Sequence, residues 1–171
     1  MAALLLPAQA FALTLLPADL ADVARASQVI VHARVVDVHS QMTAGRRSIE
    51  SIITATVIDT MKGDAVGAVS FRIPVGQVGR YRRIMPGVPE FSAGDELILF
   101  LVGRPPSLPV PFGLSQGVYR VIRRGGVAVV TPPVVDSVGV AQPVVRGDPS
   151  RRPIALGAFE QRVRAVMEPA R

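Results

Sequence analysis

The sequence predicts a mainly β protein: a small barrel of five or six strands, with a short N-terminal helix and a C-terminal amphipathic helix. Three observations predict this fold class. Short runs of β-branched and other apolar residues recur along the chain. Fifteen glycines and 15 prolines in 171 residues separate these runs, as is typical of a β-protein with many turns. Three phrases mark predicted strand ends or turns: Met61–Asp64, Phe91–Asp95 and Gly113–Gly117.

Residues 1–12 are expected to be a truncated signal segment. Ala2 to Leu6 is apolar, and Ala8–Ala10 and Ala10–Ala12 both have the small-x-small pattern that signal peptidases cut. A charged leader is missing and the apolar run is short, as a start codon assigned too far downstream would produce. The alternative is an apolar N-terminus on a cytoplasmic protein. We therefore expect an exported protein, periplasmic or extracellular.

The next segments predict a helix followed by three strands. Pro17 to Ala26 is expected to be helical, because a proline suits the first turn and two aspartates lie near the positive end of the helix dipole. Gln28 to Val38 alternates as a strand whose second face is mixed and therefore partly solvated. Ser48 to Met61 forms a second long strand, which Gly63 ends, and Ala68 to Pro74 forms a third.

The following segments complete the predicted barrel domain. Val75 to Glu90 is a long irregular excursion, and Glu96 to Val102 is a strand buried on both faces. Four prolines make Pro105 to Pro111 an extended loop. Gly117 to Arg123 then pairs with Val127 to Val130 through a glycine-containing hairpin turn. Together with the N-terminal helix, these segments define a barrel domain over residues 17–130.

Two segments follow the barrel domain. Residues 131–153 are rich in Pro, Gly and Val without a clear period, which predicts an extended segment. Residues 154–171 contain an amphipathic helix over Leu156–Met167, with an apolar stripe of Phe159, Val163, Val166 and Met167. We expect this helix to pack against the barrel. Arginines on its polar face leave a membrane-surface helix as an alternative.

Composition limits the chemistry that the chain can support. The formal charge is +6, but every basic residue except Lys62 is an arginine, and the arginines are scattered. Because aromatic stacking platforms are missing, nucleic acid is an unlikely partner. The chain has no cysteine, so disulfides and thiolate metal sites are impossible. His32 and His39 would lie on opposite faces of a strand, so we expect no metal site and no cofactor. No segment approaches the roughly 20 apolar residues that span a bilayer.

Several of these phrases resemble a known kind of domain. Thr54–Val57 leading into Met61–Gly63, followed later by Gly94–Leu101, resembles the netrin-type, OB-like domains. These include the inhibitory domain of the tissue inhibitors of metalloproteinases. The layout also resembles an uncharacterised group of exported bacterial proteins, which share a phrase similar to Gly113–Val121. The resemblance covers roughly residues 20 to 122 and implies an OB-like β-barrel. Such inhibitors place an N-terminal cysteine at the target's metal, and this chain has none.

The phrase Gly113–Gly117 matches the Gly-x-Ser-x-Gly pattern of hydrolases, with Ser115 at its centre. In those enzymes a buried strand enters the turn, a helix leaves it, and the histidine follows the serine in the chain. Here a proline-rich loop enters, a strand pattern leaves, and both histidines precede the serine. A turn before a strand therefore explains the phrase, and a serine hydrolase through Ser115 is an alternative from another class.

The long excursion contains the best candidate for a binding surface. Long loops in compact domains are often functional, and this one combines glycines, arginines and an aromatic. The candidate residues are Gly76, Gly79, Arg80, Tyr81, Arg82 and Arg83. Arginines beside a tyrosine can hold a carboxylate, a phosphate or a partner protein. The sequence thus predicts a non-enzymatic exported binding module with a protein or anionic ligand at Arg80–Arg83. The alternative is a protease inhibitor or protease-associated domain that acts through loops.

Overall fold

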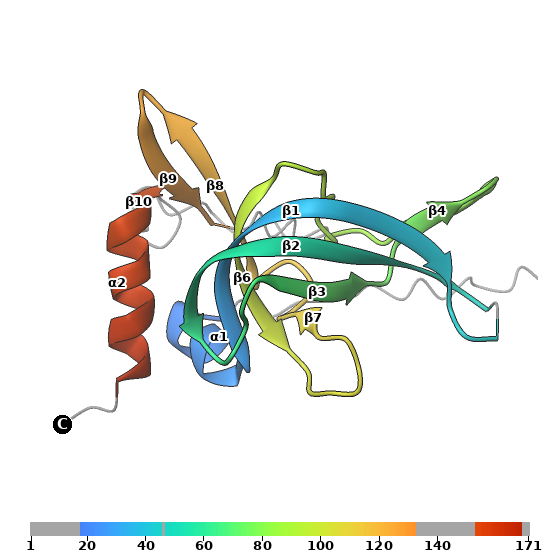
Figure 1. Ribbon diagram of the computed structural model, residues 1–171, viewed down its shortest axis with the longest axis horizontal. Helices are drawn as coiled ribbons and strands as arrows, with labels where there is room; N and C mark the ends of the chain where they lie inside the picture. Colours follow the sequence, from blue (N-terminus) through green and yellow to red (C-terminus); the bar gives the residue numbers. More distant parts are fainter. Residues whose placement is uncertain (1–17, 46, 133–152, 169–171) are drawn as a thin grey trace, which may run out of the picture.

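The computed structural model describes residues 18–45, 47–132 and 153–168, and within them the protein is mainly β, as expected. Two helices and ten strands follow one another in the order α1 (Leu20–Ala26), β1 (Val29–Met42), β2 (Ile49–Lys62), β3 (Ala68–Ile73), β4 (Gly76–Val78), β5 (Tyr81–Arg83), β6 (Glu96–Val102), β7 (Val110–Pro111), β8 (Val118–Arg124), β9 (Val127–Thr131), β10 (Ile154–Ala155) and α2 (Leu156–Met167). The helices lie at one end of the molecule, and β4 extends from the other (Figure 1).

Most predicted elements are confirmed; the two-residue strands β7 and β10 were not predicted, and two larger differences follow. Strand β1 continues past Val38 to Met42, because β2 pairs with it over the whole length. The excursion at Val75–Glu90 contains a short hairpin, β4–β5, which forms a sheet of its own. The predicted signal segment, residues 1–12, and most of the extended segment, residues 133–152, lie outside the described residues.

The strands do not close into a barrel, so this part of the prediction is wrong. The main sheet runs in the open order β10-β9-β8-β6-β1-β2-β3, with β7 attached to β6. All of its pairs are antiparallel. The proline-rich segment before β8 forms only the two-residue strand β7. Because proline has no N–H to donate, this segment cannot supply a continuous ladder between β3 and β6.

The core has two parts, one on each face of the curved sheet. Inside the curve, Phe71 and Phe91 meet edge to face at 5.3 Å, among buried aliphatic residues of β1, β2 and β6. The outer face of β1 was expected to be partly solvated, and this is confirmed. Ile30 is 0 % exposed and His32 is 5 % exposed beneath helices α1 and α2, whereas Arg34 and Val36, farther along the strand, are exposed.

Helix α2 packs on the sheet through an aromatic cluster. The ring of Phe159, on α2, lies 4.9 Å from that of Tyr119 and 6.5 Å from that of Phe100. Burial raises the pKa of Tyr119 to about 12. This packing agrees with the expectation that the C-terminal helix covers the sheet. In the described part of the chain, neither helix has the length and apolar character that a bilayer crossing requires.

Helix α1 is held at both ends by polar contacts. Asp19 caps its N-terminus by accepting a hydrogen bond from the Asp22 N–H at 2.8 Å. At the other end Lys62 Nζ donates to the carbonyls of Ala24 and Arg25, at 2.8 and 3.1 Å. A cation at this position satisfies carbonyls that the helix leaves unpaired. The chain's only lysine thus joins the end of β2 to α1.

We expect Phe159→Ala to lower the pKa of Tyr119 from about 12 toward its ordinary 10, because the cavity admits water beside the phenol. Ultraviolet titration of the phenolate, in a Tyr81→Phe background, measures this pKa. Because the folded-state pKa of Tyr119 lies above its unfolded value, the neutral phenol contributes to folding stability, and this contribution is complete below pH 10. The contribution is lost as pH rises through about 12. Phe159→Leu, the matched control, should keep the raised value. An unaltered pKa in Phe159→Ala would contradict the described packing.

Candidate functional site

The predicted binding residues form the β4–β5 hairpin. Gly76 pairs with Arg83, and Val78 pairs with Tyr81. Gly76, Arg82 and Arg83 line a pocket beneath the hairpin. The turn residues Gly79 and Arg80 and the first residue of β5, Tyr81, form the tip of the hairpin and do not line the pocket. The structure therefore divides the six candidates into a pocket group and a tip group.

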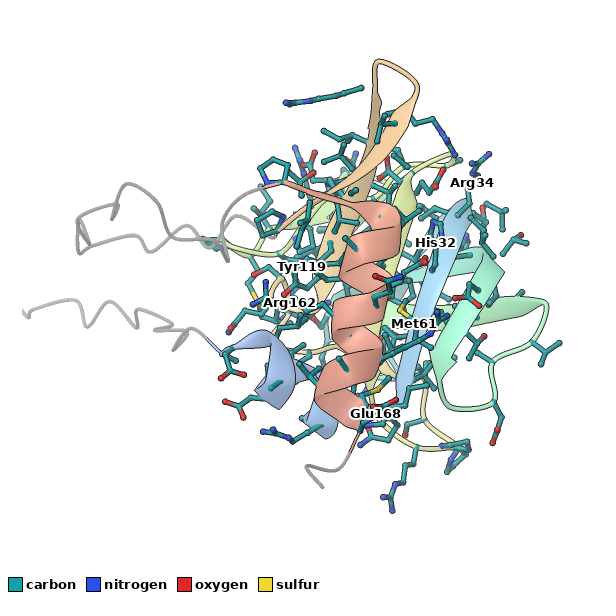
Figure 2. The ribbon with its side chains drawn as sticks, turned by 90° about the vertical axis from the view of Figure 1, so that its left-hand side faces the viewer. His32, Arg34, Met61, Tyr119, Arg162 and Glu168 are labelled. Atoms are coloured by element: carbon teal, nitrogen blue, oxygen red, sulfur yellow. The ribbon has the colours of Figure 1, made fainter. Side chains whose placement is uncertain are left out.

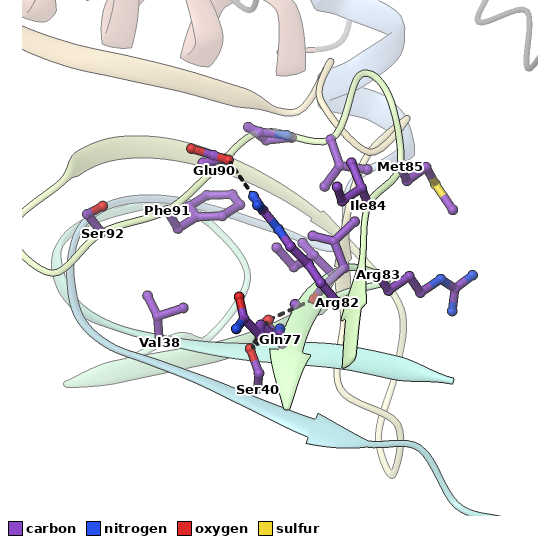
Figure 3. Close-up of a pocket in the computed structure, with 16 residues that line it drawn as sticks. Val38, Ser40, Gln77, Arg82, Arg83, Ile84, Met85, Glu90, Phe91 and Ser92 are labelled. Carbon is purple, nitrogen blue, oxygen red and sulfur yellow. Dashed lines mark hydrogen bonds and ion pairs between the residues drawn. The ribbon is translucent and has the colours of Figure 1, made fainter. Parts of the chain in front are cut away.

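The pocket, called the mouth pocket below, lies between the hairpin, the C-terminal half of β1, the N-terminal end of β2 and the segment 84–92 (Figure 3). Its volume is about 410 Å³, within the range of small-molecule sites. The apolar lining residues are Val38, Ile73, Val75, Ile84, Met85, Val88, Pro89 and Phe91. The polar lining residues, apart from Gly76, are Ser40, Ser51, Gln77, Arg82, Arg83, Glu90 and Ser92. The lining of the pocket is thus divided about evenly between apolar and polar residues.

A pair of serines attaches the hairpin to the main sheet. Ser40 Oγ and Ser51 Oγ lie 2.8 Å apart across β1 and β2. Ser51 Oγ donates to the Val75 carbonyl at 2.7 Å, and the Gln77 N–H donates to Ser40 Oγ at 3.2 Å. A Cβ at Gly76 would lie 2.5 Å from Ser51 Oγ, so glycine is required for this close approach. We call these contacts the serine latch.

Of the three arginines on the hairpin, Arg82 is the one most available to a ligand in the pocket. Its guanidinium is 3.8 Å from Glu90 Oε1, and the side chains are 60 % and 93 % exposed, so this ion pair is weak. Arg83 donates to Ser48 Oγ. Arg80 lies over the Tyr81 ring at 5.1 Å and donates to the Tyr81 hydroxyl. Figure 3 shows the Arg82 side chain running from the hairpin toward Glu90.

The mouth pocket is continuous with the inner core. Ile73 and Phe91 belong to both the inner core and the pocket lining. On β1, the register against β2 shifts between Val35 and Asp37, which leaves Val36 as an extra residue. Beyond this bulge Val38 is directed to the side of the sheet that Val35 faces before it. The pocket is therefore the open end of the interior of the curved sheet.

A second polar cluster lies at the opposite end, beneath α2, and the sequence did not predict it. The His32 side chain is 6 % exposed, and its Nε2 lies 3.0 Å from Glu96 Oε1. Its Nδ1 lies 3.5 Å from Oε1 of Glu160, on α2. Figure 2 shows His32 and Arg34 on β1 beside this helix. Both ring nitrogens thus face carboxylates, which links β1 to β6 and to α2. The alternating polarity of β1 could not predict that α2, far along the chain, covers His32.

Glu96 is the centre of this cluster. Its side chain is 10 % exposed, 2.7 Å from Arg34 and 3.6 Å from Arg123. Burial raises the pKa of Glu96, but hydrogen bonds from Arg34 and His32 and the nearby positive charges outweigh burial and lower that pKa. Glu96 is therefore held as a carboxylate, and the cluster is best explained as a structural contact between the sheet and α2.

Ser115 lies in a tight turn between β7 and β8. It is 4 % exposed, and within the described residues its Oγ is the one buried side-chain oxygen or nitrogen without a hydrogen-bond partner. A strand leaves the turn where a hydrolase would have a helix. A Cβ at Gly117 would lie 2.6 Å from the Phe100 carbonyl, so close backbone packing explains this glycine. These contacts support a structural turn.

Across the described ranges no group of three or more His, Cys, Asp or Glu side chains could hold a metal ion. No protein-family model matches the chain, and no curated protein and no solved structure is significantly similar to it. The site therefore has to be interpreted from its own geometry.

We expect Glu96→Gln to destabilise the protein by about 1–3 kcal/mol at neutral pH, because it replaces a largely buried, charged acceptor of Arg34 and His32 by a neutral one. The lowered pKa means that the stabilisation is present above pH 4.5 and is lost as pH falls through the folded-state value. Urea unfolding of the wild type and the variant over this pH range measures the difference. Glu90→Gln, at a carboxylate that is 93 % exposed, is the control and should match the wild type. A difference that stayed constant with pH would contradict the assigned role.

Proposed function

We propose that this protein is a non-enzymatic, exported binding module that captures an anionic group with an apolar neighbour in the mouth pocket. One observation carries the proposal: the guanidinium of Arg82, whose side chain is 60 % exposed, lines a pocket of mixed apolar and polar residues and has only a weak ion-pair partner, Glu90. Guanidinium groups bind carboxylates and phosphates through paired hydrogen bonds. The apolar lining gives the rest of the ligand a place to be buried.

We propose an OB-like architecture for the module, of the netrin type. Support comes from the pairing of β1 with both β2 and β6, and of β2 with β3. In addition the Arg72 N–H, on β3, donates to the Pro109 carbonyl beside β7 at 3.0 Å. Because the intervening pairs are antiparallel, β7 runs parallel to β3 across this contact. OB-folds are partly open five-stranded barrels that bind through a strand face and adjacent loops.

The tip of the hairpin favours a second candidate, a protease-associated or inhibitory domain that meets its partner through a loop. Tyr81 is 58 % exposed and is stacked with Arg80. Tyrosine and arginine are the residues that most often anchor protein interfaces. Since the tip residues do not line the pocket, substitutions can distinguish the two candidates.

We expect N-acetylphenylalanine to shift the backbone amide resonances of β4, β5 and residues 84–92 in two-dimensional NMR spectra. Its amide, which lacks the carboxylate, should bind more weakly. Arg82→Gln should weaken binding of the acid about tenfold, the magnitude of one hydrogen bond to a charged group. Arg80→Gln is the matched control, since it removes a charge from the same hairpin outside the pocket, and it should leave the affinity unchanged. Equal losses in both variants, or no shifts at the pocket, would refute the pocket as the binding site.

Export is proposed from the small-x-small patterns at Ala8–Ala10 and Ala10–Ala12. We expect the mature protein in the periplasmic or extracellular fraction to begin after Ala10 or Ala12. Mass spectrometry of its N-terminal peptide measures this. Recovery of the intact Met1 terminus from the cytoplasmic fraction would contradict export.

A further inference from the structure

The C-terminal part of β1, residues 36–42, has a partner strand on one side only. Pairing of β1 with β6 covers Val29–Arg34, and the next contacts on that side are two bonds with Val35. Its N–H donates to the Asp95 carbonyl and its carbonyl accepts from the Gly94 N–H, both at 2.8 Å. Pairing with β2, in contrast, continues to Met42. Among the described residues no backbone group pairs with residues 36–42 on the side where β6 has ended.

The register shows which backbone groups face this free edge. In an antiparallel pair, alternate residues direct both their N–H and their C=O toward the partner strand. The Thr43 N–H donates to the Ser48 carbonyl, so the odd-numbered residues beyond the bulge face β2. The N–H and C=O groups of Val38, Ser40 and Met42 therefore face away from β2. They form a regular row that another strand could extend.

This edge has few of the features that usually prevent strand addition. Native edges are commonly protected by charged side chains, above all lysine, by proline or by a bulge within the exposed stretch. Residues 37–42 contain neither lysine nor proline, their one carboxylate is that of Asp37 at the start of the stretch, and the bulge at Val36 lies before them. The side chains at this edge include exposed apolar groups, with Val36 51 % and Val38 38 % exposed. Val38 and Ser40 also line the mouth pocket, so the free edge and the pocket adjoin.

We propose that the ligand of the module is an extended acidic peptide, which adds as a strand to residues 37–42 of β1. This inference rests on the proposed function, because it uses the same pocket and the same arginine. Side chains two residues apart on a strand share one face and lie about 7 Å apart. An apolar side chain can thus enter the mouth pocket while a carboxylate two residues away meets Arg82. The recognised pattern is apolar-x-acidic.

Charge favours an acidic peptide over a second copy of this chain. The charged residues that line the mouth pocket are Arg82, Arg83 and Glu90, which leaves a net positive charge. A symmetric pair of copies would use the same surface on both chains and bring two arginine-bearing hairpins together. Like charges so placed oppose association. An acidic segment is instead attracted by the positive charge of the pocket, and its main-chain hydrogen bonds supply affinity as in other strand-addition complexes.

The test selects displayed random peptides on the immobilised full-length chain and then synthesises the most enriched peptide. We expect enrichment of apolar-x-acidic sequences. Methylating one backbone nitrogen of that peptide at a time should weaken binding about tenfold at alternate positions. The positions between them should stay within about twofold, because their N–H groups face solvent. This measurement leaves the protein unaltered, so it does not depend on the folding of a variant.

A variant pair tests the same edge from the side of the protein. Val38→Pro removes an outward-facing N–H at an edge position, where proline is tolerated, and should weaken peptide binding about tenfold. Val38→Thr also changes the side chain but keeps the N–H, and should remain within about threefold of the wild type.

Three outcomes would overturn the inference. The first is a selection without the apolar-x-acidic pattern. The second is methylation that weakens binding equally at every position or at none; if Arg82→Gln still weakens the peptide, the proposed function survives and only strand addition fails. The third is a concentration-dependent dimer, seen by sedimentation velocity, that Val38→Pro abolishes. That outcome would assign the edge to a second copy of the chain.

Discussion

The rest of the structure depends on how β1 is paired along its length. In its first half β1 lies between β2 and β6 and is buried on both faces, with Ile30 and Val31 both 0 % exposed. One extra residue, Val36, then interrupts the register against β2. A bulge shifts the alternation of side chains and bends the strand. Beyond the bulge β1 still pairs with β2 but no longer with β6. The first half of β1 therefore lies within the core, and its second half lines the mouth pocket.

The two ends of the molecule are stabilised by different chemistry. Beneath α2, Glu96 is surrounded by His32, Arg34 and Arg123, and these contacts offset the cost of burying its charge. At the other end the serine latch of Ser40 and Ser51 uses neutral hydroxyl groups. Neutral hydrogen bonds position the hairpin without competing for an anion. Arg82 forms only a weak ion pair with Glu90 among the described residues, so its guanidinium is the charge at the open end that is least compensated.

Sequence reasoning predicted the elements better than their assembly. The helix ending at Ala26 and the helix Leu156–Met167 follow from apolar residues at helical spacing, and the strand Glu96–Val102 follows from a short continuous apolar run after a turn. The barrel was predicted from recurring strand runs, the turn phrases between them and the resemblance to OB-like domains, but the prolines of the segment before β8 leave too few N–H donors to close the sheet. The outer face of β1 was expected to be partly solvated, as Arg34 and Val36 are, but the burial of His32 was not predicted. Periodicity within one strand contains no information about a helix far along the chain.

The sequence by itself determined the mainly β class, the positions of most strands and turns, and the absence of any thiolate chemistry. It also located the excursion that bears three arginines, although it predicted neither its hairpin nor which arginine lies at the pocket. Only the tertiary structure decided that Arg82 lies at the pocket while Arg80 stacks on Tyr81. It likewise decided that His32 is buried. The physical reason is that a side chain's surroundings are set by the register of strand pairing and by contacts between residues distant in the chain, which local patterns do not encode.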